Sequence, residues 1–450
     1  MLRKRPLKVI KRAVDCTQYV RYSALFINGA KATETFTYIK PHIDYPQQIK
    51  DRDLIQQNLI KRNSNIDLNK IEHLWSVYEE LKQRKFNYDK KKSELGKELG
   101  KIINTEPESD IATKYKMQIN LIKDNIRKLK EPLWSAEEAA IVEVLKLPNT
   151  LHPLTPNIEN KVLYTYQTPP QSKKDHLKIG HKLNLLNFKR NDHYYLRGDA
   201  AIFELGAKFH FSNILRRNKF VQFSNPDFVK SVIVEGCGQD HTNPDVTFIL
   251  HHIDDSNVNV DSRLHLTGGA SLSSFLAYHA KNVLPSKVFP LKYFTMGRQY
   301  IPAPSDEDSL LHVSQSSVIQ FFGATKTNSE LDVLLHEVIE ILKSIYCELN
   351  YHYRLSILPA NKLHMWESLR VVVEMFSTSL NSYVEVANIS VSGDFISKRL
   401  LLTYMENKES QFPHIISGTI LNVSKFFGCV LEQDVGFSVP EQFRVENWSV

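Results

Sequence analysis

Cysteine is scarce in this chain of 450 residues, which contains only four. No two of them form a Cys-x-x-Cys pair, so the sequence offers no support for a disulfide framework or a zinc site. No run of about 18 apolar residues occurs, and we therefore expect no insertion into a membrane. Glycine-rich phosphate-binding signatures are missing as well. With 42% hydrophobic and 24% charged residues, the chain has the composition of a globular protein of two or three domains.

Positive charge is concentrated at the N-terminus. Residues 1–26 contain seven basic residues and one acidic residue, whereas the whole chain carries a net charge of only +7. A basic, acid-poor amphipathic start followed by Ser and Ala is typical of a mitochondrial transit peptide. We therefore assign residues 1–30 to a transit peptide whose cleavage site is unspecified, and predict a location in the mitochondrial matrix. The alternative is a basic tail that contacts nucleic acid.

The next segment has the periodicity of helices. Residues 44–63 place apolar side chains at helical spacing, and a heptad pattern follows from residue 68. After a turn-forming stretch at 104–110, a second helix continues the same spacing, so the two helices should fold back on each other. We predict a helical arm over residues 31–146 with an antiparallel coiled coil at about 68–145. The predicted seam positions are Ile71, Leu74, Tyr78, Leu81, Lys85, Tyr88, Lys92, Leu95, Leu99 and Ile102 in the first helix, and Tyr115, Ile119, Ile122, Ile126, Leu129, Leu133, Ala136 and Ala140 in the second.

The outer positions of this arm are rich in lysine and arginine. A solvated face with local ion pairs is the simplest explanation, and charge alone favours it. A long lever with a basic excess would also suit contacts with the phosphates of a nucleic acid. The candidates for such contacts are Lys82, Arg84, Lys90, Lys91, Lys97, Lys101, Lys123, Arg127 and Lys128.

The stretch after the arm, residues 147–156, reads LPNTLHPLTP, and its prolines prevent it from continuing a helix. It resembles the LPN-x-x-H-x-x-x-P junction of seryl-tRNA synthetases, where a coiled-coil arm meets a class II catalytic domain. Residues 175–204 resemble the family's next run, from its Asp-His pair to its Leu-x-Gly-Asp-Ala turn. The resemblance covers residues 44–446. It implies an α+β fold, with a class II aminoacyl-tRNA synthetase core around an antiparallel sheet in residues 147–450.

The resemblance also implies partners. Residues 220–228 resemble class II motif 1, which builds the family's dimer interface, although the motif's usual glycine is Lys219 here. Phe220, Phe223 and Pro226 are therefore candidates for a dimer interface. Because the family's arm grips transfer RNA, a serine transfer RNA is the expected nucleic acid.

The residues that the family uses for chemistry are largely replaced. The serine loop, Thr-x-Glu in the family, ends at Gly269, which cannot pair with the ammonium group of serine. Motif 2, Phe-Arg-x-Glu in the family, has Ile301 in place of the arginine and Ala303 in place of the glutamate. Arg298 lies three residues before Ile301 on a predicted strand, so we expect it to point to the opposite face.

The remaining motifs are mixed. Ser316 stands where a phenylalanine would stack on adenine, and Gln320 replaces a glutamate on the same strand. Motif 3 has Lys425 in place of its arginine, which keeps the charge but not the planar guanidinium. Glu385 matches the family's metal-carrying glutamate.

Because several catalytic positions are lost together while the framework motifs persist, we predict that the fold is kept and the reaction is lost. The expected protein is a pseudoenzyme, with no catalytic residues, no cofactor and no metal. It would bind transfer RNA and form a dimer, either with a second copy or with the active mitochondrial seryl-tRNA synthetase. Two alternatives remain: an ATP-dependent ligase of altered specificity, and a purely structural partner that does not bind RNA.

Overall fold

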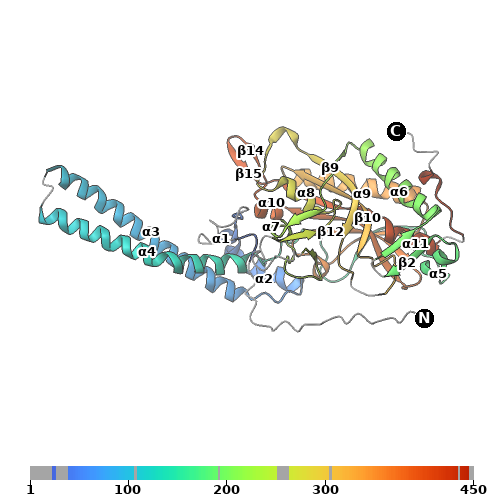
Figure 1. Cartoon of the computed structure of the whole chain (residues 1–450), viewed down its shortest axis with the longest axis horizontal. Coiled ribbons are helices and arrows are strands. Elements are labelled where there is room, and N and C mark those ends of the chain that lie inside the picture. Colours follow the sequence, from blue (N-terminus) through green and yellow to red (C-terminus); the bar gives the residue numbers. More distant parts are fainter. Residues whose placement is uncertain are drawn as a thin grey trace, which may run out of the picture.

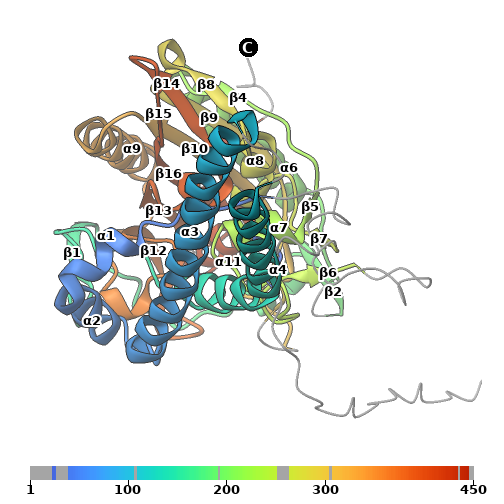
Figure 2. The ribbon, with the colours of Figure 1, turned by 90° about the vertical axis from the view of Figure 1, so that its left-hand side faces the viewer.

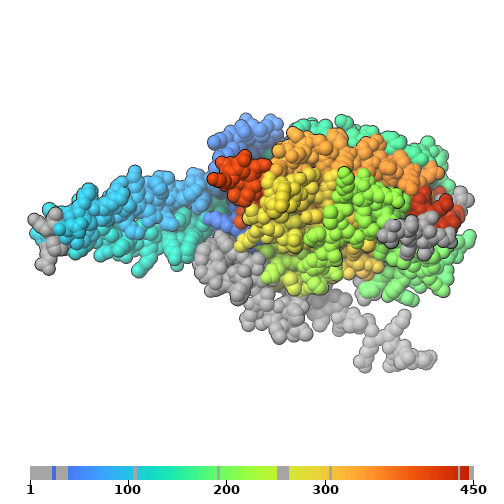
Figure 3. Space-filling model, turned by 90° about the horizontal axis from the view of Figure 1, so that it is seen from above, coloured from blue at the N-terminus to red at the C-terminus, as the bar shows by residue number. Residues whose placement is uncertain are grey.

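The computed structural model describes residues 23–26, 39–105, 109–190, 193–250, 263–303, 307–433 and 436–444. A helical arm projects from a core of mixed helix and strand (Figure 1). The space-filling view shows the arm leaving the core as a narrow rod (Figure 3). None of the described helices is both long and apolar enough to cross a membrane.

The arm consists of α3 (Leu68–Thr105) and α4 (Asp110–Val144), which pack against each other (Figure 2). The predicted seam positions lie at this contact, where every one of them except Lys85 is buried or half-buried. Near the base of the arm, Lys70 Nζ lies 2.9 Å from Glu143 Oε1, as an antiparallel pair requires. At about 1.5 Å per residue, the 38 residues of α3 span about 57 Å.

Two short helices and a 3₁₀ turn fix the base of the arm. They are α1 (Tyr45–Gln48), η1 (Ile49–Asp51) and α2 (Arg52–Lys61). Their buried side chains form one cluster with the first turn of α3 and the end of α4. The members of this cluster are Tyr45, Leu59, Leu68, Ile71, Val144 and Leu147.

The core is built on an eight-stranded sheet in which every neighbouring pair is antiparallel except β4 and β9. This confirms the predicted α+β class II architecture. In spatial order the strands are β1 (Lys161–Tyr166), β11 (Tyr353–Ile357), β12 (Leu369–Ser377), β13 (Ser382–Gly393), β16 (His414–Asn422), β10 (Gln315–Thr325), β9 (Leu291–Tyr300) and β4 (Val221–Gln222).

Smaller elements surround this sheet. The minor strands are β2 (Leu186–Arg190), β3 (His193–Leu196), β5 (Phe228–Lys230), β6 (Phe248–Ile249), β7 (Leu264–Leu266), β8 (Val283–Pro285), β14 (Thr403–Glu406) and β15 (Glu409–Gln411). The core helices are α5 (His176–Lys182), α6 (Asp199–Arg217), α7 (Ser231–Gly236), α8 (Leu272–His279), α9 (Asn328–Glu348), α10 (Phe395–Leu400) and α11 (Val423–Gln433). Single 3₁₀ turns are η4 (Ser286–Val288), η5 (Ala360–Lys362) and η6 (Glu441–Phe443).

Helices cover both faces of the large sheet, and the alternation of side chains along β10 shows why. Ile319 and Phe321 point into a core cluster formed with α6, α9 and α11. Phe322 and Ala324 point into a second cluster formed with α7, α8 and α10. Because successive strand residues face opposite sides, a strand buried on both faces needs such a continuous apolar run.

A buried charge ties α11 to the Asp-His segment that the sequence singled out. Glu432 is fully buried, and its Oε1 lies 2.7 Å from Nδ1 of His176. Burial raises the pKa of Glu432, but hydrogen bonds from His176, Ser379 and Ser377 outweigh it and lower the pKa to about 2. The carboxylate therefore stays charged and holds the end of α11 against α5.

Part of the segment assigned to the transit peptide, whose cleavage site is unspecified, lies in the core. Leu25 and Phe26 are 0% and 2% exposed and belong to the core cluster on the α7 face. The Oγ of Ser23 donates to Oε1 of Glu235 at 2.6 Å, and the backbone N–H of Leu25 donates to Oε2 at 2.7 Å. These contacts join residues more than 200 positions apart, so no local pattern could reveal them. Residues 1–22 lie outside the described part of the chain.

Two truncations should therefore differ sharply in stability. Removal of residues 1–22 is expected to leave the melting temperature unchanged. Removal of residues 1–30 deletes Phe26 from the core, and loss of a buried phenylalanine costs about 3–5 kcal/mol. Thermal unfolding of the two purified proteins measures the difference. Equal melting temperatures would show that the buried segment contributes nothing.

Candidate functional site

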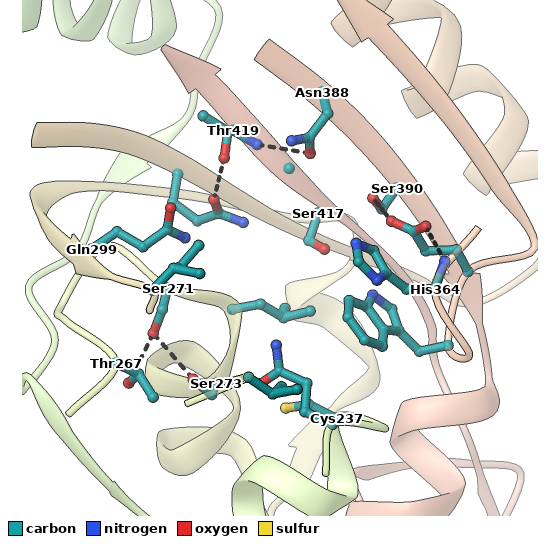
Figure 4. A pocket seen from close by; sticks show the side chains of 18 of the residues that line it. Cys237, Thr267, Ser271, Ser273, Gln299, His364, Asn388, Ser390, Ser417 and Thr419 are labelled. Carbon is teal, nitrogen blue, oxygen red and sulfur yellow. Dashed lines mark hydrogen bonds between the residues drawn. The ribbon is translucent and has the colours of Figure 1, made fainter. Parts of the chain in front are cut away.

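A cavity of about 590 Å³ opens over the face of the sheet that also packs α7, α8 and α10 (Figure 4). Strands β10, β13 and β16 form its floor, with Asn388, Ser417 and Thr419 directed into it. Its walls come from three loops, at 237–247, 267–273 and 364–370. The structure thus brings together the serine loop, motif 2, the Glu385 region and motif 3, as the sequence predicts.

The serine loop is tied by hydrogen bonds to the segment at 225–227. The backbone N–H of Gly269 donates to Oδ1 of Asp227 at 2.7 Å, and a Cβ at this position would lie 2.7 Å from the carbonyl oxygen of Asn225. Beside it, the hydroxyl of Thr267 joins a hydrogen-bonded cluster with Ser271. A glutamate at position 269 would supply the missing charge, but it would fit only after a shift of the backbone around Asn225.

Motif 2 is the hairpin of β9 and β10. Ile301 follows β9 directly, lines the cavity and is 53% exposed. Arg298 faces away from the cavity, as expected: its Nη1 donates to the hydroxyl of Tyr194 at 3.4 Å, and its Nη2 lies 3.7 Å from Glu204. It is thus held on the α6 side of the sheet and cannot substitute for the missing arginine.

The polar side chains of the floor mostly bond to one another. The Oγ1 of Thr419 donates to Oε1 of Gln320 at 3.1 Å, and the amide of Asn422 donates to Ser316 at 3.3 Å. Ser316 and Gln320 are both buried. At these two positions the cavity offers neither an aromatic face nor a charge.

A network of charged side chains lines the cavity, and two of its members, Arg370 and Glu367, were not predicted from the sequence. Arg370 lies between Glu367 and Glu385, with N···O distances of 2.7 and 2.5 Å. Burial raises the pKa of Glu385, but Arg370 and Lys425 lower it by more. Burial lowers the pKa of Arg370, and Glu385 and Glu367 raise it above its ordinary value. Arg370 and Glu385 therefore both stay charged. The only sequence signal was an acid and a base three residues apart.

The arm's junction is fastened to the wall of the same cavity. The backbone N–H of Asn149 donates to the carbonyl of Met365, and its side-chain amide donates to the carbonyl of Trp366 at 3.0 Å. The buried guanidinium of Arg62 donates to the carbonyls of Asn149 and His364. On this wall the rings of His364 and Trp366 stack with centroids 4.5 Å apart. The LPN stretch thus positions the arm relative to the cavity.

The nine predicted RNA-contact residues all lie exposed on the arm, well away from the cavity. Two of them are held in local ion pairs: Lys82 lies 3.0 Å from Glu79, and Lys101 lies 2.8 Å from Glu98. The guanidinium of Arg84 lies over the ring of Tyr88.

The dimer candidates divide into two kinds. Phe220 is 3% exposed and packs on Phe321 in the core, so its own chain buries it and it cannot contact a partner. Sequence alone could not separate an inward phenylalanine from an outward one here. Phe223 is half-buried and Pro226 is exposed, so both remain candidates.

Comparison with known proteins agrees with this geometry. The family model of the tRNA synthetase class II core domain (G, H, P, S and T) matches residues 266–434. Over 423 residues the chain is 30% identical to the serine–tRNA synthetase-like protein Slimp of Drosophila melanogaster, covering 92% of this chain and 89% of that protein. The chain belongs to the seryl-tRNA synthetase family.

Other relatives extend this result. The mitochondrial serine–tRNA ligase of Mus musculus is 28% identical over 329 residues, which cover 69% of this chain and 62% of the mouse protein. The crystal structure of cytoplasmic serine–tRNA ligase from Naegleria fowleri in complex with AMP superposes with a TM-score of 0.74 at 17% identity. It covers 87% of this chain and 94% of that one, and shows that the fold is shared.

A seryl-tRNA synthetase would hold ATP and magnesium in this cavity, and the residues present do not fit that group. Ile301, which the resemblance aligns with the family's motif 2 arginine, gives the cavity an apolar side chain at this position. The carboxylate of Glu385 is already engaged by Arg370 and by the amide of Asn388. Among the described residues, no group of three or more His, Cys, Asp or Glu is placed to hold a metal ion. No reaction step through ATP or a metal can be derived from this site.

Proposed function

We propose that this chain is a catalytically inactive mitochondrial member of the seryl-tRNA synthetase family. It binds serine transfer RNA through its arm and pairs with the active mitochondrial enzyme, thereby supporting mitochondrial translation. The observation that carries this proposal is the side chain of Ile301, which lines the cavity where the family places an arginine. Without this arginine the α-phosphate loses an oriented, charge-stabilising partner, so we expect ATP binding to be very weak.

The rival function is an ATP-dependent ligase with a substrate other than serine. Such an enzyme needs ATP in the same cavity, so calorimetric titration of the purified protein with ATP and magnesium separates the two. We expect no saturable heat up to millimolar ATP. Micromolar binding would overturn the proposal in favour of the ligase.

The arm supports RNA binding by its shape and charge. Its exposed basic side chains occur along both helices, and a rod about 57 Å long can follow the backbone of a transfer RNA far from the cavity. The 28% identity to the mitochondrial serine–tRNA ligase of Mus musculus and the basic N-terminus support the mitochondrial location. Because Ser23 to Phe26 are part of the fold, the proposed cleavage lies before Ser23.

The pairing proposal rests on the surface around β4. This strand lies at the edge of the large sheet, and Val221 on it is 57% exposed. Next to it, Phe223 packs against Tyr278, which is 61% exposed. An exposed edge strand beside exposed aromatic surface invites association, so a partner is expected to cover it. The active synthetase is the favoured partner because a homodimer would contain no working site.

Mixing experiments test this pairing. Co-expression with the active mitochondrial seryl-tRNA synthetase, followed by native mass spectrometry, should give a heterodimer of one copy each. Val221→Lys should reduce the heterodimer strongly, because it places an uncompensated charge in the contact. Val162→Lys is a matched control, since Val162 is 49% exposed on β1, the strand at the opposite edge of the sheet. A stable monomer, or a homodimer that does not exchange, would contradict the proposed pairing.

A further inference from the structure

The cavity contains an internal ion-pair triad of Arg370, Glu367 and Glu385. Nη1 of Arg370 lies 2.7 Å from Oε1 of Glu367, and Nη2 lies 2.5 Å from Oε1 of Glu385. The side chains of Arg370 and Glu367 are 13% and 0% exposed, while Glu385 is 28% exposed toward the cavity. The three residues come from two neighbouring strands, β12 and β13, and from the turn that precedes β12.

Further hydrogen bonds occupy the two carboxylates. Ser390 donates to Oε1 of Glu367, and the backbone N–H of His364 donates to its Oε2 at 2.8 Å. The amide of Asn388 donates to Oε1 of Glu385 at 2.8 Å. Each carboxylate oxygen that faces Arg370 therefore has a second donor as well. Charge-assisted hydrogen bonds are stronger than neutral ones, and these bonds fix the geometry of all three side chains.

We infer that Arg370 is a built-in counter-ion for Glu385 and Glu367. Its guanidinium supplies the positive charge that a divalent cation would supply in the family fold. The inference deepens the proposed loss of function, on which it rests. Two carboxylates and one guanidinium leave one negative charge, and the cations of Lys425 and Arg62 also act on these carboxylates. The site therefore carries no excess of negative charge without any ligand. Magnesium and manganese prefer oxygen ligands with free lone pairs, and a fixed positive charge beside Glu385 repels them.

The triad also gives the cavity a structural task. Glu367 belongs to the wall at 364–368, which receives Asn149 and Arg62 from the arm and its junction. The carbonyl of Glu367 itself accepts from Nη2 of Arg62 at 2.5 Å. Arg370 therefore links the sheet to the wall on which the arm is seated. Carboxylates that would suit a metal ion thus help, in this chain, to hold the wall on which the arm is seated.

Substitution of Arg370 tests the inference. In the full chain, Arg370→Met leaves two uncompensated carboxylates side by side. We expect the melting temperature to fall by roughly 5 to 10 °C, and millimolar manganese to restore most of that loss. Manganese titration followed by electron paramagnetic resonance should detect one bound ion in the variant and none in the wild type.

The chain offers a matched control in Arg354→Met. Arg354 lies on β11 and donates to Glu374 at 2.7 Å, in a pair with one carboxylate instead of two. This variant should lose stability without recovery by manganese. Arg370→Lys, which keeps the positive charge, should fold and still exclude manganese, so the test survives if Arg370→Met does not fold.

Two outcomes would overturn the inference. The first is wild-type binding of manganese that disappears in Glu385→Gln, because the counter-ion would then not exclude the metal. The second is an Arg370→Met protein whose melting temperature does not change when manganese is added and whose electron paramagnetic resonance spectrum shows no bound manganese. Both readouts are independent of ATP, so they are distinguishable from failure of the proposed loss of catalysis, which ATP binding decides.

Discussion

Replacement of Ile301 by arginine together with Ala303 by glutamate is expected to leave serine-dependent ATP–pyrophosphate exchange at background. The two substitutions restore the motif 2 pattern, but Gly269 still provides no carboxylate for the ammonium group of serine. Removing a single oriented charge-stabilising group costs about 10² to 10³ in rate, and at least five positions are changed in this chain. Restoring two of them therefore leaves most of the loss in place.

The converse experiment is the control. The active mitochondrial seryl-tRNA synthetase carrying isoleucine and alanine at the equivalent positions should lose roughly 10⁴-fold or more in exchange rate. Adding Gly269→Glu to the double variant is not a simple repair, because its Cβ would meet the carbonyl of Asn225 at 2.7 Å. Measurable exchange by the double variant would mean that only motif 2 had been lost, and would contradict a loss spread over the serine loop and motif 2 together.

Neutralising Lys90, Lys91 and Lys97 together should weaken transfer RNA binding by about 10- to 1,000-fold at low salt. Each phosphate contact contributes about 0.9 to the slope of log K against log salt for a duplex, so the slope should fall by about 2 to 3. The loss should be similar for several RNAs, because phosphate contacts carry no sequence information. Filter binding at a series of salt concentrations measures both quantities.

Lys82 and Lys101 supply the matched control for this experiment. They are exposed on the same helix, but each already lies within 3.0 Å of a glutamate three residues away. Neutralising them should change affinity and slope less than the first set does. An affinity that does not depend on salt, or that survives removal of residues 68–145, would place the RNA site on the core.

The arm was predictable because its information is local. A heptad pattern predicts which face of each helix is buried. In the structure the predicted faces of α3 and α4 pack against each other, and Lys85 is the one exposed residue among the seam positions. The class II core was predictable from ordered motifs, and the cavity does unite Gly269's loop, Ile301 and Glu385. In these cases short-range spacing or order along the chain was sufficient.

The parts that sequence missed depend on contacts between distant segments. Phe26 follows a basic N-terminal segment but is buried, because its neighbour Leu25 hydrogen-bonds to Glu235 and Phe26 packs in the cluster that includes α7. Phe220 is buried although motif 1 suggested an interface. Arg370 gave no signal of its own, since its role requires β13 to bring Glu385 within reach of β12. Contacts of this kind arise only when the folded sheet brings distant segments together, so no local sequence pattern predicts them.

The central claim is that this chain binds the RNA but does not charge it, and one reaction mixture tests both halves. The purified chain is incubated alone with mitochondrial serine transfer RNA, serine, ATP and magnesium, and the RNA is assayed for binding to protein and for attached serine. We predict RNA that is bound in a salt-dependent manner and carries no serine. Serylated transfer RNA formed by this chain, in the absence of the active enzyme, would contradict that claim.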